Sequence, residues 1–216
     1  MNIAIIGAGN VGRALAGSFV RAGHSVTVAS RDTEDARSVA AATGAGIASS
    51  NLAAAATAEV VVLATPFSSA PAIAAEIAEV VAGKVVVDAT NRMSVGANGP
   101  EMDTKTSNAE ELAVLLPDAS VVKAFNTIFA SNLGEPATEG VQLDGYVAGD
   151  DAAAKSRVLD LVASIGLDPV DVGPLGRSRQ LEGLAFLNIT MNMANGGSWQ
   201  SGWKLVGAPA TVPAAA

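Results

Sequence analysis

The first residues that suggest chemistry are three glycines in the stretch IAIIGAGNVGRALA, near the start of the chain. Gly7, Gly9 and Gly12 have the G-x-G-x-x-G spacing, after an apolar run typical of a strand and before a helical pattern. In such a loop the first glycine permits a tight turn, the second lets the backbone approach a pyrophosphate, and the third allows close helix–strand packing. The N–H groups at the start of the helix attract the phosphates. We therefore predict a dinucleotide-binding loop, with Asn10 and Val11 also at the cofactor.

The residues after the next apolar run, VTVAS, bear on the choice between NAD and NADP. An enzyme that uses NAD commonly has an acidic residue here, which accepts a hydrogen bond from the ribose 2′-hydroxyl. This chain has Ser30 and Arg31 instead, and a guanidinium can bind a phosphate through two parallel hydrogen bonds. Arg37, in the next predicted helix, is expected as a second cation, although Asp32 partly neutralises Arg31. The pattern predicts NADP(H), the alternative being a solvated loop with incidental charge.

Further ligand contacts are expected where later strands end, because parallel strands deliver their loops to one edge of the sheet. These residues are Thr65, Pro66 and Phe67 in LATPF, Asn91 in DATNR, and Asn126, Thr127 and Ile128 in KAFNTI. We expect the first four at the cofactor and the last three at a second substrate. The alternative for each of these residues is that it helps to form a loop and contacts no ligand.

The chain offers no convincing acid–base group. His24 follows a glycine at the end of a predicted helix and is expected at the opposite end of the sheet, and Lys123 lies in a predicted buried strand. The chain has no cysteine, so thiol nucleophiles and disulfides are excluded, and no metal site is expected. We therefore expect no catalytic side chain, and direct hydride transfer from a nicotinamide to a flavin-type ring. Holding the two carbons roughly 3–3.5 Å apart then provides most of the catalysis.

These loops need a scaffold that brings strand ends together. Seven short apolar runs are typical of strands buried on both faces: NIAIIG, SVTVAS, EVVVLAT, KVVVDAT, SVVKAFN, GYVAGD and DPVDVG. Ala-rich segments that close on Gly separate the first few and are typical of helices. The alternation predicts an α/β fold, a Rossmann-type doubly wound and mostly parallel sheet. We expect an NADP-binding domain at 1–172, a small C-terminal helical lobe at 173–207 and a flexible tail at 208–216.

Composition limits the kinds of partner. The chain has 216 residues, half of them hydrophobic, and a net charge of −8. An acidic protein of this kind is expected to bind nucleic acid or an anionic membrane weakly, because such partners bind to basic surfaces. The apolar runs are too short for a transmembrane helix and the first residues do not read as a signal peptide, so a cytoplasmic location is expected.

Several segments together resemble the NADPH-dependent reductases of the deazaflavin coenzyme F-420. They are MNIAIIGAGNVGRALA, VASRD, LATPF, VVKAFNTI and DVGPLGRSRQLEGLAFLNITMNMANG, and they span almost the whole chain. The resemblance implies a dimeric oxidoreductase that exchanges hydride between NADP(H) and F-420 without a protein acid or base. It implies that Ser30 and Arg31 read the 2′-phosphate. It also places the deazaflavin in a cleft between the Rossmann domain and the helical lobe.

The chain departs from that family at two loops. Archaeal members begin with Gly-Gly-Thr-Gly where this chain has Gly-Ala-Gly-Asn, and they carry His-Thr where it has Asn126-Thr127. The Phe-Asn-Thr-Ile form is similar to the cytosolic domain of metalloreductases, which pass hydride from NADPH to a flavin. The acceptor is therefore F-420 or a flavin such as FMN or FAD. A non-catalytic NADP(H)-sensing protein is the alternative from another class, whereas imine and β-hydroxyacid reductases normally need a longer helical domain.

The last predicted helix, 177–195, is apolar over much of its surface. Its apolar residues are Leu181, Leu184, Phe186, Leu187, Ile189, Met191 and Met193. One helix cannot bury such a surface unless a partner covers it, so we expect a homodimer through this lobe. Trp199 and Trp203, four residues apart, are expected to share a helical face.

Overall fold

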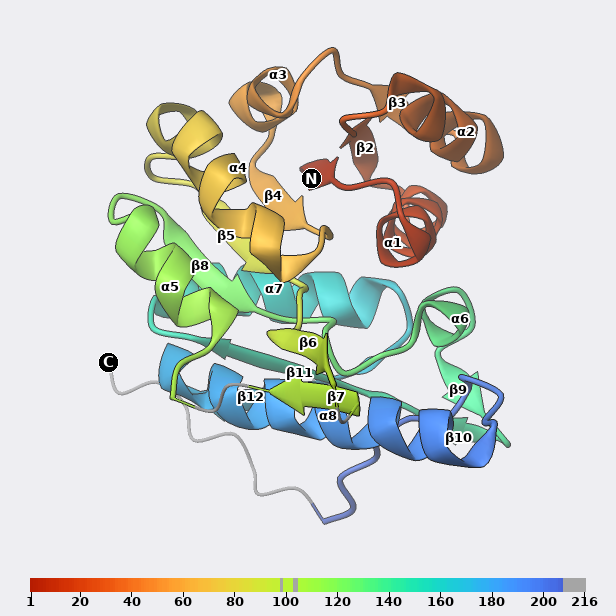
Figure 1. Ribbon diagram of the computed structural model, residues 1–216. Coiled ribbons are helices and arrows are strands. Elements are labelled where there is room, and N and C mark those ends of the chain that lie inside the picture. The colour runs from red at the N-terminus through yellow and green to blue at the C-terminus, as the bar shows by residue number, and fades with distance from the viewer. Residues whose placement is uncertain (98, 103–104, 208–216) are drawn as a thin grey trace.

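The computed structural model describes residues 1–97, 99–102 and 105–207. Within them, eight strands form one sheet in the order β12-β11-β8-β5-β4-β1-β2-β3 (Figure 1). Its strands are β1 (Asn2–Ile6), β2 (Ser25–Ala29), β3 (Gly46–Ile47), β4 (Val60–Leu63), β5 (Val85–Asp88), β8 (Ser120–Lys123), β11 (Asp144–Gly149) and β12 (Asp168–Gly173). All neighbours are parallel except β8 and β11. The predicted Rossmann-type, mostly parallel sheet is confirmed.

Helices cover both faces of this sheet. They are α1 (Asn10–Arg21), α2 (Thr33–Thr43), α3 (Asn51–Thr57), α4 (Ala70–Ile77), α5 (Asn108–Leu115), α6 (Ala130–Leu133), α7 (Ala152–Ser164) and α8 (Ser178–Asn195). Alternate residues of β1 enter different cores, because neighbouring side chains of a strand point to opposite faces. Ile3 and Ile5 pack with α1, α2 and α7, whereas Ala4 and Ile6 pack with α3, α4 and α5. This two-sided burial explains why the strands are continuous apolar runs.

The order of the strands places a switch point between β1 and β4. From β1 the chain proceeds to β2 and β3 on one side, and from β4 to β5 and β8 on the other. Loops that leave the carboxyl ends of β1 and β4 therefore diverge and leave a crevice between them. The glycine loop follows β1, and Thr65 and Pro66 follow β4.

α8 lies against the β11–β12 end of the sheet (Figure 1). Leu181 and Leu184 pack there with Tyr146 and Ala148. The domain boundary expected at residue 172 stays a prediction, and β12 ends one residue later, at Gly173. Within the described residues, short 3₁₀ turns lie at Phe67–Ser69, Ala78–Val80 and Leu175–Arg177. The tail expected at 208–216 lies outside the described residues.

The helical lobe differs from expectation after α8. The helix ends at Asn195, because Gly196 adopts a left-handed conformation with φ 58° at its C-terminal cap. Trp199 also has a positive φ, 58°, and lies in a segment without helix. The prediction that Trp199 and Trp203 share a helical face is therefore wrong.

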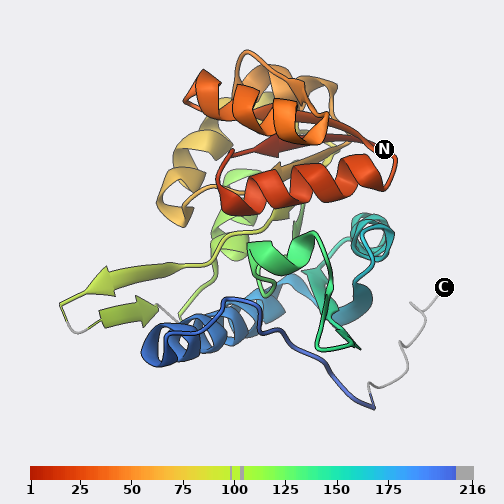
Figure 2. The same ribbon diagram turned by 90° about the vertical axis from the view of Figure 1, so that its right-hand side faces the viewer.

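Two small hairpins complete the described chain. β6 (Met93–Gly96) pairs antiparallel with β7 (Gly99–Met102), and β9 (Ala137–Thr138) pairs with β10 (Val141–Gln142). The β6–β7 hairpin projects from the body of the molecule, and β7 lies beside α8 (Figure 2). None of the described helices is long and apolar enough to cross a membrane.

Candidate functional site

The three glycines of the first loop have different surroundings. A Cβ on Gly7 would lie 2.3 Å from the Ala64 oxygen, and one on Gly12 would lie 1.9 Å from the Gly7 oxygen. Both positions therefore exclude any larger residue. A Cβ on Gly9 would meet no atom within 4 Å, so the space above Gly9 is open. This combination fits a loop whose backbone approaches a ligand at Gly9.

The helix that follows has an unsatisfied start. Gly9 is the N-terminal cap of α1, no side chain caps it, and its first turn contains no acidic residue. The N–H groups at this end consequently remain available to an anion, which the helix dipole also attracts. By contrast, α2 is capped by Asp32, whose Oδ1 accepts from the Glu34 N–H at 2.9 Å.

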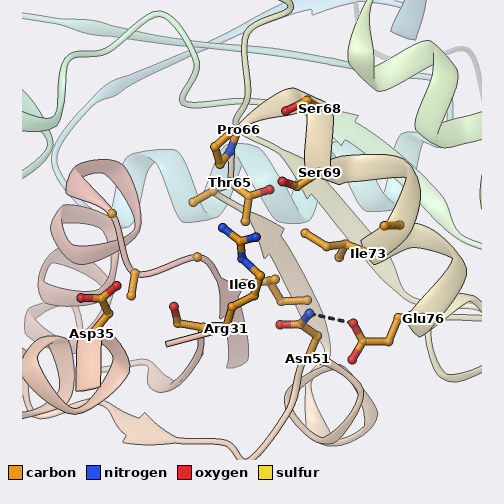
Figure 3. Close-up of a pocket in the computed structure, with 16 residues that line it drawn as sticks. Ile6, Arg31, Asp35, Asn51, Thr65, Pro66, Ser68, Ser69, Ile73 and Glu76 are labelled. Atoms are coloured by element: carbon orange, nitrogen blue, oxygen red, sulfur yellow. Dashed lines mark hydrogen bonds between the residues drawn. The ribbon is translucent and has the colours of Figure 1, made fainter. Parts of the chain in front are cut away.

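A cavity of about 530 Å³ lies over the switch point (Figure 3). Residues after β1, β2 and β4 line it, among them Gly7, Gly9, Ser30, Arg31 and Thr65. The guanidinium of Arg31 points toward Thr65 in the middle of the labelled side chains (Figure 3). The loops after three strands that sequence analysis assigned to the cofactor thus meet around one cavity.

Arg37 is not brought to this cavity. It lies in α2, its side chain is 61% exposed, and it forms an ion pair with Glu34 one turn earlier. The cavity wall near Arg31 contains Asp35 instead. A role for Arg37 as a second phosphate ligand finds no support in this position.

Thr65 carries a hydroxyl that lacks a partner. Its Oγ1 is buried and forms no hydrogen bond with the described residues. A buried polar atom is costly without a partner, so an unpaired hydroxyl in a cavity wall indicates a place for a ligand group.

A second cavity, of about 660 Å³, shares Gly9, Thr65 and Pro66 with the first. It is also lined by residues that sequence analysis assigned to the cofactor: Asn10, Val11, Phe67 and Asn91. The Phe67 ring in this wall also has a cation–π contact, because the Arg92 guanidinium carbon lies 5.9 Å from the ring centre.

A third cavity, of about 220 Å³, shares Val11, Ala89 and Asn91 with the second. Its wall contains the three residues predicted at a second substrate: Asn126, Thr127 and Ile128. Side chains of α8 and the Trp199 ring complete it, and Phe129 meets Trp199 edge to face with ring centres 5.3 Å apart. Because each cavity shares wall residues with the next, the three lie next to one another in a row from Arg31 to Trp199.

Sequence reasoning missed a buried ion cluster beside this row. Lys123 is fully buried, and its Nζ lies 2.8 Å from Oδ2 of Asp88, 2.7 Å from Oε1 of Glu182 and 2.7 Å from the Thr90 carbonyl oxygen. Asp88 and Lys123 are paired in register on β5 and β8. A lysine and an aspartate at the ends of neighbouring apolar runs were the available signal, but nothing in the sequence pointed to Glu182 as the third member.

Glu182 also holds two backbone groups near the site. Its carboxylate accepts from the Arg92 N–H at 3.1 Å and from the Asn108 N–H at 2.9 Å. The Asn108 side chain in turn donates to Asp88 at 3.2 Å. One side chain of α8 thus connects the loop after β5 with the start of α5.

His24 lies directly before β2, away from the carboxyl ends of the strands where the cavities are. Its Nε2 is 3.0 Å from Oγ of Ser164, and its Nδ1 is 3.4 Å from the amino group of Met1. Partial burial and, secondarily, the nearby amino group lower the pKa of His24. Within the described residues no group of three or more His, Cys, Asp and Glu side chains could hold a metal ion.

Comparisons with known proteins agree with this geometry. Residues 2–92 match a family model described as NADP oxidoreductase, coenzyme F420-dependent. The F420-dependent NADP reductase of Methanothermobacter thermautotrophicus is 35% identical over 212 residues, which cover 90% of each chain. The crystal structure of a putative F420-dependent NADP-reductase from Arthrobacter sp. FB24 is 32% identical, with a TM-score of 0.85 over 95% of this chain and 99% of that one.

Two further similarities are more limited. The metalloreductase STEAP3 of Rattus norvegicus is 31% identical over 182 residues, which are 84% of this chain but only 36% of that protein. A reductive aminase from Aspergillus terreus, in complex with NADPH, has a TM-score of 0.67 at 22% identity, and this chain covers 63% of it. The second similarity concerns the fold alone.

Proposed function

The chain belongs to the family of coenzyme F420-dependent NADP oxidoreductases and is an NADP-dependent oxidoreductase, and we propose that it transfers a hydride directly between NADPH and F420. In the forward direction the nicotinamide loses a hydride, the deazaflavin carbon gains it, and solvent supplies the proton that completes the reduced ring. The row of three cavities, which has a cation at one end and an apolar chamber at the other, carries the proposal.

NADP(H) fits the first two cavities. Ser30 and Arg31 stand where a 2′-phosphate needs donors, and the open space at Gly9 faces the uncapped start of α1. Thr65 supplies the unpaired hydroxyl for a ribose or phosphate oxygen. Pro66, Phe67 and Asn91 then form the walls around the nicotinamide half.

The acceptor ring fits the third cavity, between the sheet edge and α8. Ala185 and Ile189 of α8 form one side of it, and Phe125 and Ile128 form another. These apolar side chains suit a flat ring and exclude water from the transfer. The lobe that sequence analysis placed at 173–207 therefore completes the acceptor cleft.

Catalysis by positioning agrees with the groups that are present. None of the described residues that line the third cavity has a titratable side chain. Lys123, a fully buried cation outside this cavity wall, is already bound by Asp88 and Glu182. A hydride transfer between two carbon atoms needs alignment but no protein acid or base.

One assay tests the proposed function. Enzyme, NADPH and oxidised F420 are mixed, and the loss of the deazaflavin's visible absorbance is followed, with FMN and FAD in parallel. We expect rapid reduction of F420 and slow or no reduction of FMN and FAD. Preferential reduction of a flavin would support the second candidate, a flavin reductase, which the similarity to the metalloreductase favours. Tight binding of NADPH without reduction of any ring would indicate an NADP(H)-sensing protein.

The pH profile of single-turnover hydride transfer tests the mechanism. Because no side chain exchanges a proton in the transfer step, we expect a rate that is flat with pH over the range in which the protein is folded. A bell-shaped profile would mean that an acid or base takes part.

A further inference from the structure

Asn126, beside the third cavity, follows a residue with an unusual backbone conformation. It is 6% exposed, and Phe125, directly before it, has a φ of 65° although it is not a glycine. A bulky residue in the left-handed region is strained, and such strain is retained mainly where the surroundings enforce it at a functional site. The turn aims residue 126 back toward α8 and the loop after β5.

Two hydrogen bonds fix the orientation of the Asn126 carboxamide. Its Nδ2 donates to the Leu181 carbonyl oxygen at 3.0 Å and to Oδ1 of Asn91 at 2.9 Å. A backbone carbonyl can only accept, so the group that faces Leu181 must be the amide nitrogen. Asn91 is oriented in the same manner, because its Nδ2 donates to the backbone oxygen of Asn126 at 3.1 Å. Both hydrogens of the Asn126 amide are therefore used.

The remaining atom of this side chain, Oδ1, has no partner. It is buried and forms no hydrogen bond with any of the described residues. Neighbouring Asn188, which lines the same cavity, is satisfied by contrast: its Oδ1 accepts from Asn192 and from Ser201, and its Nδ2 donates to the Ser201 carbonyl oxygen. Since buried acceptors are rarely left unpaired, a donor on a ligand in this cavity would satisfy the Asn126 oxygen.

The chemistry of the donor follows from the shape and polarity of the chamber. The cavity is small and mostly apolar, so the ligand part inside it is a flat ring with little polarity except at one edge. Its donor is a neutral N–H or O–H, because no carboxylate lines the cavity to balance a cation. The pyrimidinedione ring of deazaflavins and flavins has such a group, an imide N–H between two carbonyls.

We propose that Asn126 determines acceptor specificity by presenting a fixed hydrogen-bond acceptor to the imide N–H of the acceptor ring. The inference rests on the proposed function, since it assigns the third cavity to that ring. Asn91 and the Leu181 carbonyl are positioning groups, which prevent the carboxamide from rotating to offer its N–H groups. Rings that have a lone pair at this edge instead of an N–H are consequently rejected.

The buried ion cluster maintains this arrangement. Glu182 follows Leu181 in α8 and is fixed to Lys123 and to the Arg92 N–H, which follows Asn91. Leu181 and Asn91, which hold the Asn126 carboxamide, are therefore each next in sequence to a residue of this anchor: Glu182 and Arg92.

Two matched acceptors test the proposal. They are 5-deazariboflavin and its derivative methylated at the imide nitrogen, which lacks the donor. Binding is measured from the intrinsic fluorescence of each analogue with the enzyme–NADP⁺ complex, and reduction by NADPH is measured separately. For the wild-type protein we expect the parent compound to be preferred on the order of tenfold to a hundredfold in both measurements.

Substitution at Asn126 separates hydrogen bonding from steric exclusion of the methyl group. Asn126→Leu keeps the branched shape of the side chain but has no acceptor, so the preference is expected to fall to about twofold or less. Asn195→Ala, at the exposed end of α8, is the control and is expected to keep the wild-type ratio. Thermal unfolding of Asn126→Leu and of a second variant, Asn126→Ala, reports whether each is folded, and the NADPH affinity of both is expected to change less than about threefold.

The outcomes distinguish this inference from the proposed function. Reduction of both analogues at equal efficiency by the wild type would overturn the role of Asn126 and leave the proposed function standing. Selective binding of the parent compound without hydride transfer would overturn the proposed function and leave the role of Asn126 in binding standing. A large loss of NADPH affinity in both Asn126 variants would assign the oxygen to the nicotinamide carboxamide and overturn the inference.

Discussion

Nζ of Lys123 lies 2.7 Å from Oε1 of Glu182, and neither side chain is more than 2% exposed. With Asp88, this pair joins the ends of β5 and β8 to α8. Lys123→Met removes the only cation of the cluster among the described residues and leaves two buried carboxylates without a counter-charge. We expect a loss of about 3–5 kcal/mol in the free energy of unfolding, measured by urea denaturation.

A partly exposed lysine provides the control for this prediction. Lys155 lies 3.1 Å from Asp171, and their side chains are 17% and 28% exposed. Lys155→Met is expected to cost about 1 kcal/mol or less, because solvent screens the pair. If both substitutions cost the same, the buried cluster would not be the tether between α8 and the sheet.

Gly9 and Gly12 differ in a way that two substitutions to alanine can reveal. A Cβ at Gly9 meets open space, so Gly9→Ala is expected to fold normally but to lower NADPH affinity on the order of tenfold or more, because the methyl group occupies the pyrophosphate's position. A Cβ at Gly12 would lie 1.9 Å from the Gly7 oxygen, so Gly12→Ala is expected to lose stability as well. Thermal unfolding and NADPH titration of both variants measure the difference, and normal NADPH binding by Gly9→Ala would contradict the assignment.

Arg31 and Arg37 form a second matched pair. Arg31 lines the first cavity, whereas Arg37 is ion-paired with Glu34 on α2. We expect Arg31→Ala to weaken NADPH binding by roughly 1.5–3 kcal/mol, because one charge-assisted phosphate contact is lost, and to affect NADH little. Arg37→Ala is expected to leave both affinities nearly unchanged. Equal losses of NADPH and NADH affinity in Arg31→Ala would show that the guanidinium does not read the 2′-phosphate.

The cavities over the switch point could be predicted because they depend on strand order alone. An apolar run followed by a loop and a helix determines which end of a parallel strand carries the loop, so the residues after β1, β2 and β4 were expected to meet. The β6–β7 hairpin was not anticipated from the sequence. The last helix was expected to end at residue 195, before the Gly-Gly pair at 196–197, and α8 ends at Asn195.

Side-chain pairing between distant elements could not be predicted. Glu182 lies 59 residues from Lys123, and only the packing of α8 on the sheet brings the two together. The Arg37–Glu34 pair differs, because the two residues are three apart in α2 and such a contact follows from helical spacing. The positions of the loops follow from the spacing of residues along the chain, whereas the polar contacts between α8 and the sheet depend on how these layers pack.

Glu110 and Arg179 couple α5 to α8 in a pH-dependent manner. Arg179 donates to the Glu110 carboxylate at 2.8 and 2.7 Å, and Glu110 also completes the capping box with Ser107. The hydrogen bond from Arg179, followed by those from Ser107, lowers the pKa of Glu110 below its usual value of 4.5, against the opposing effect of burial. Its contribution is therefore complete above about pH 4.5 and disappears as the pH falls through the lower folded pKa.

Glu110→Gln tests this contribution. The variant is expected to be less stable than the wild type near neutral pH, by about 1 kcal/mol or less since Arg179 is partly exposed, and to match it in acid. Urea denaturation from pH 7 down to the acid limit measures the difference. In an Arg179→Ala background the same substitution is expected to have a smaller effect, and an undiminished effect there would mean that the capping box, not the ion pair, is responsible.

The outer face of α8 predicts the oligomeric state. Leu187 and Met191 are four residues apart, hence on the same side of the helix, and are 49% and 53% exposed. Large apolar side chains gathered on one helix commonly mark a surface that a partner covers, and a second copy of the chain presents the same surface by symmetry. We therefore expect a homodimer by light scattering at micromolar concentration, and a monomer for the double variant Leu187→Glu with Met191→Glu.

Val114→Glu, at an equally apolar position on α5 that is 80% exposed, is the control and should remain dimeric. A wild-type protein that scatters as a monomer would remove the prediction, and a dimer that survives both charges on α8 would move the interface elsewhere.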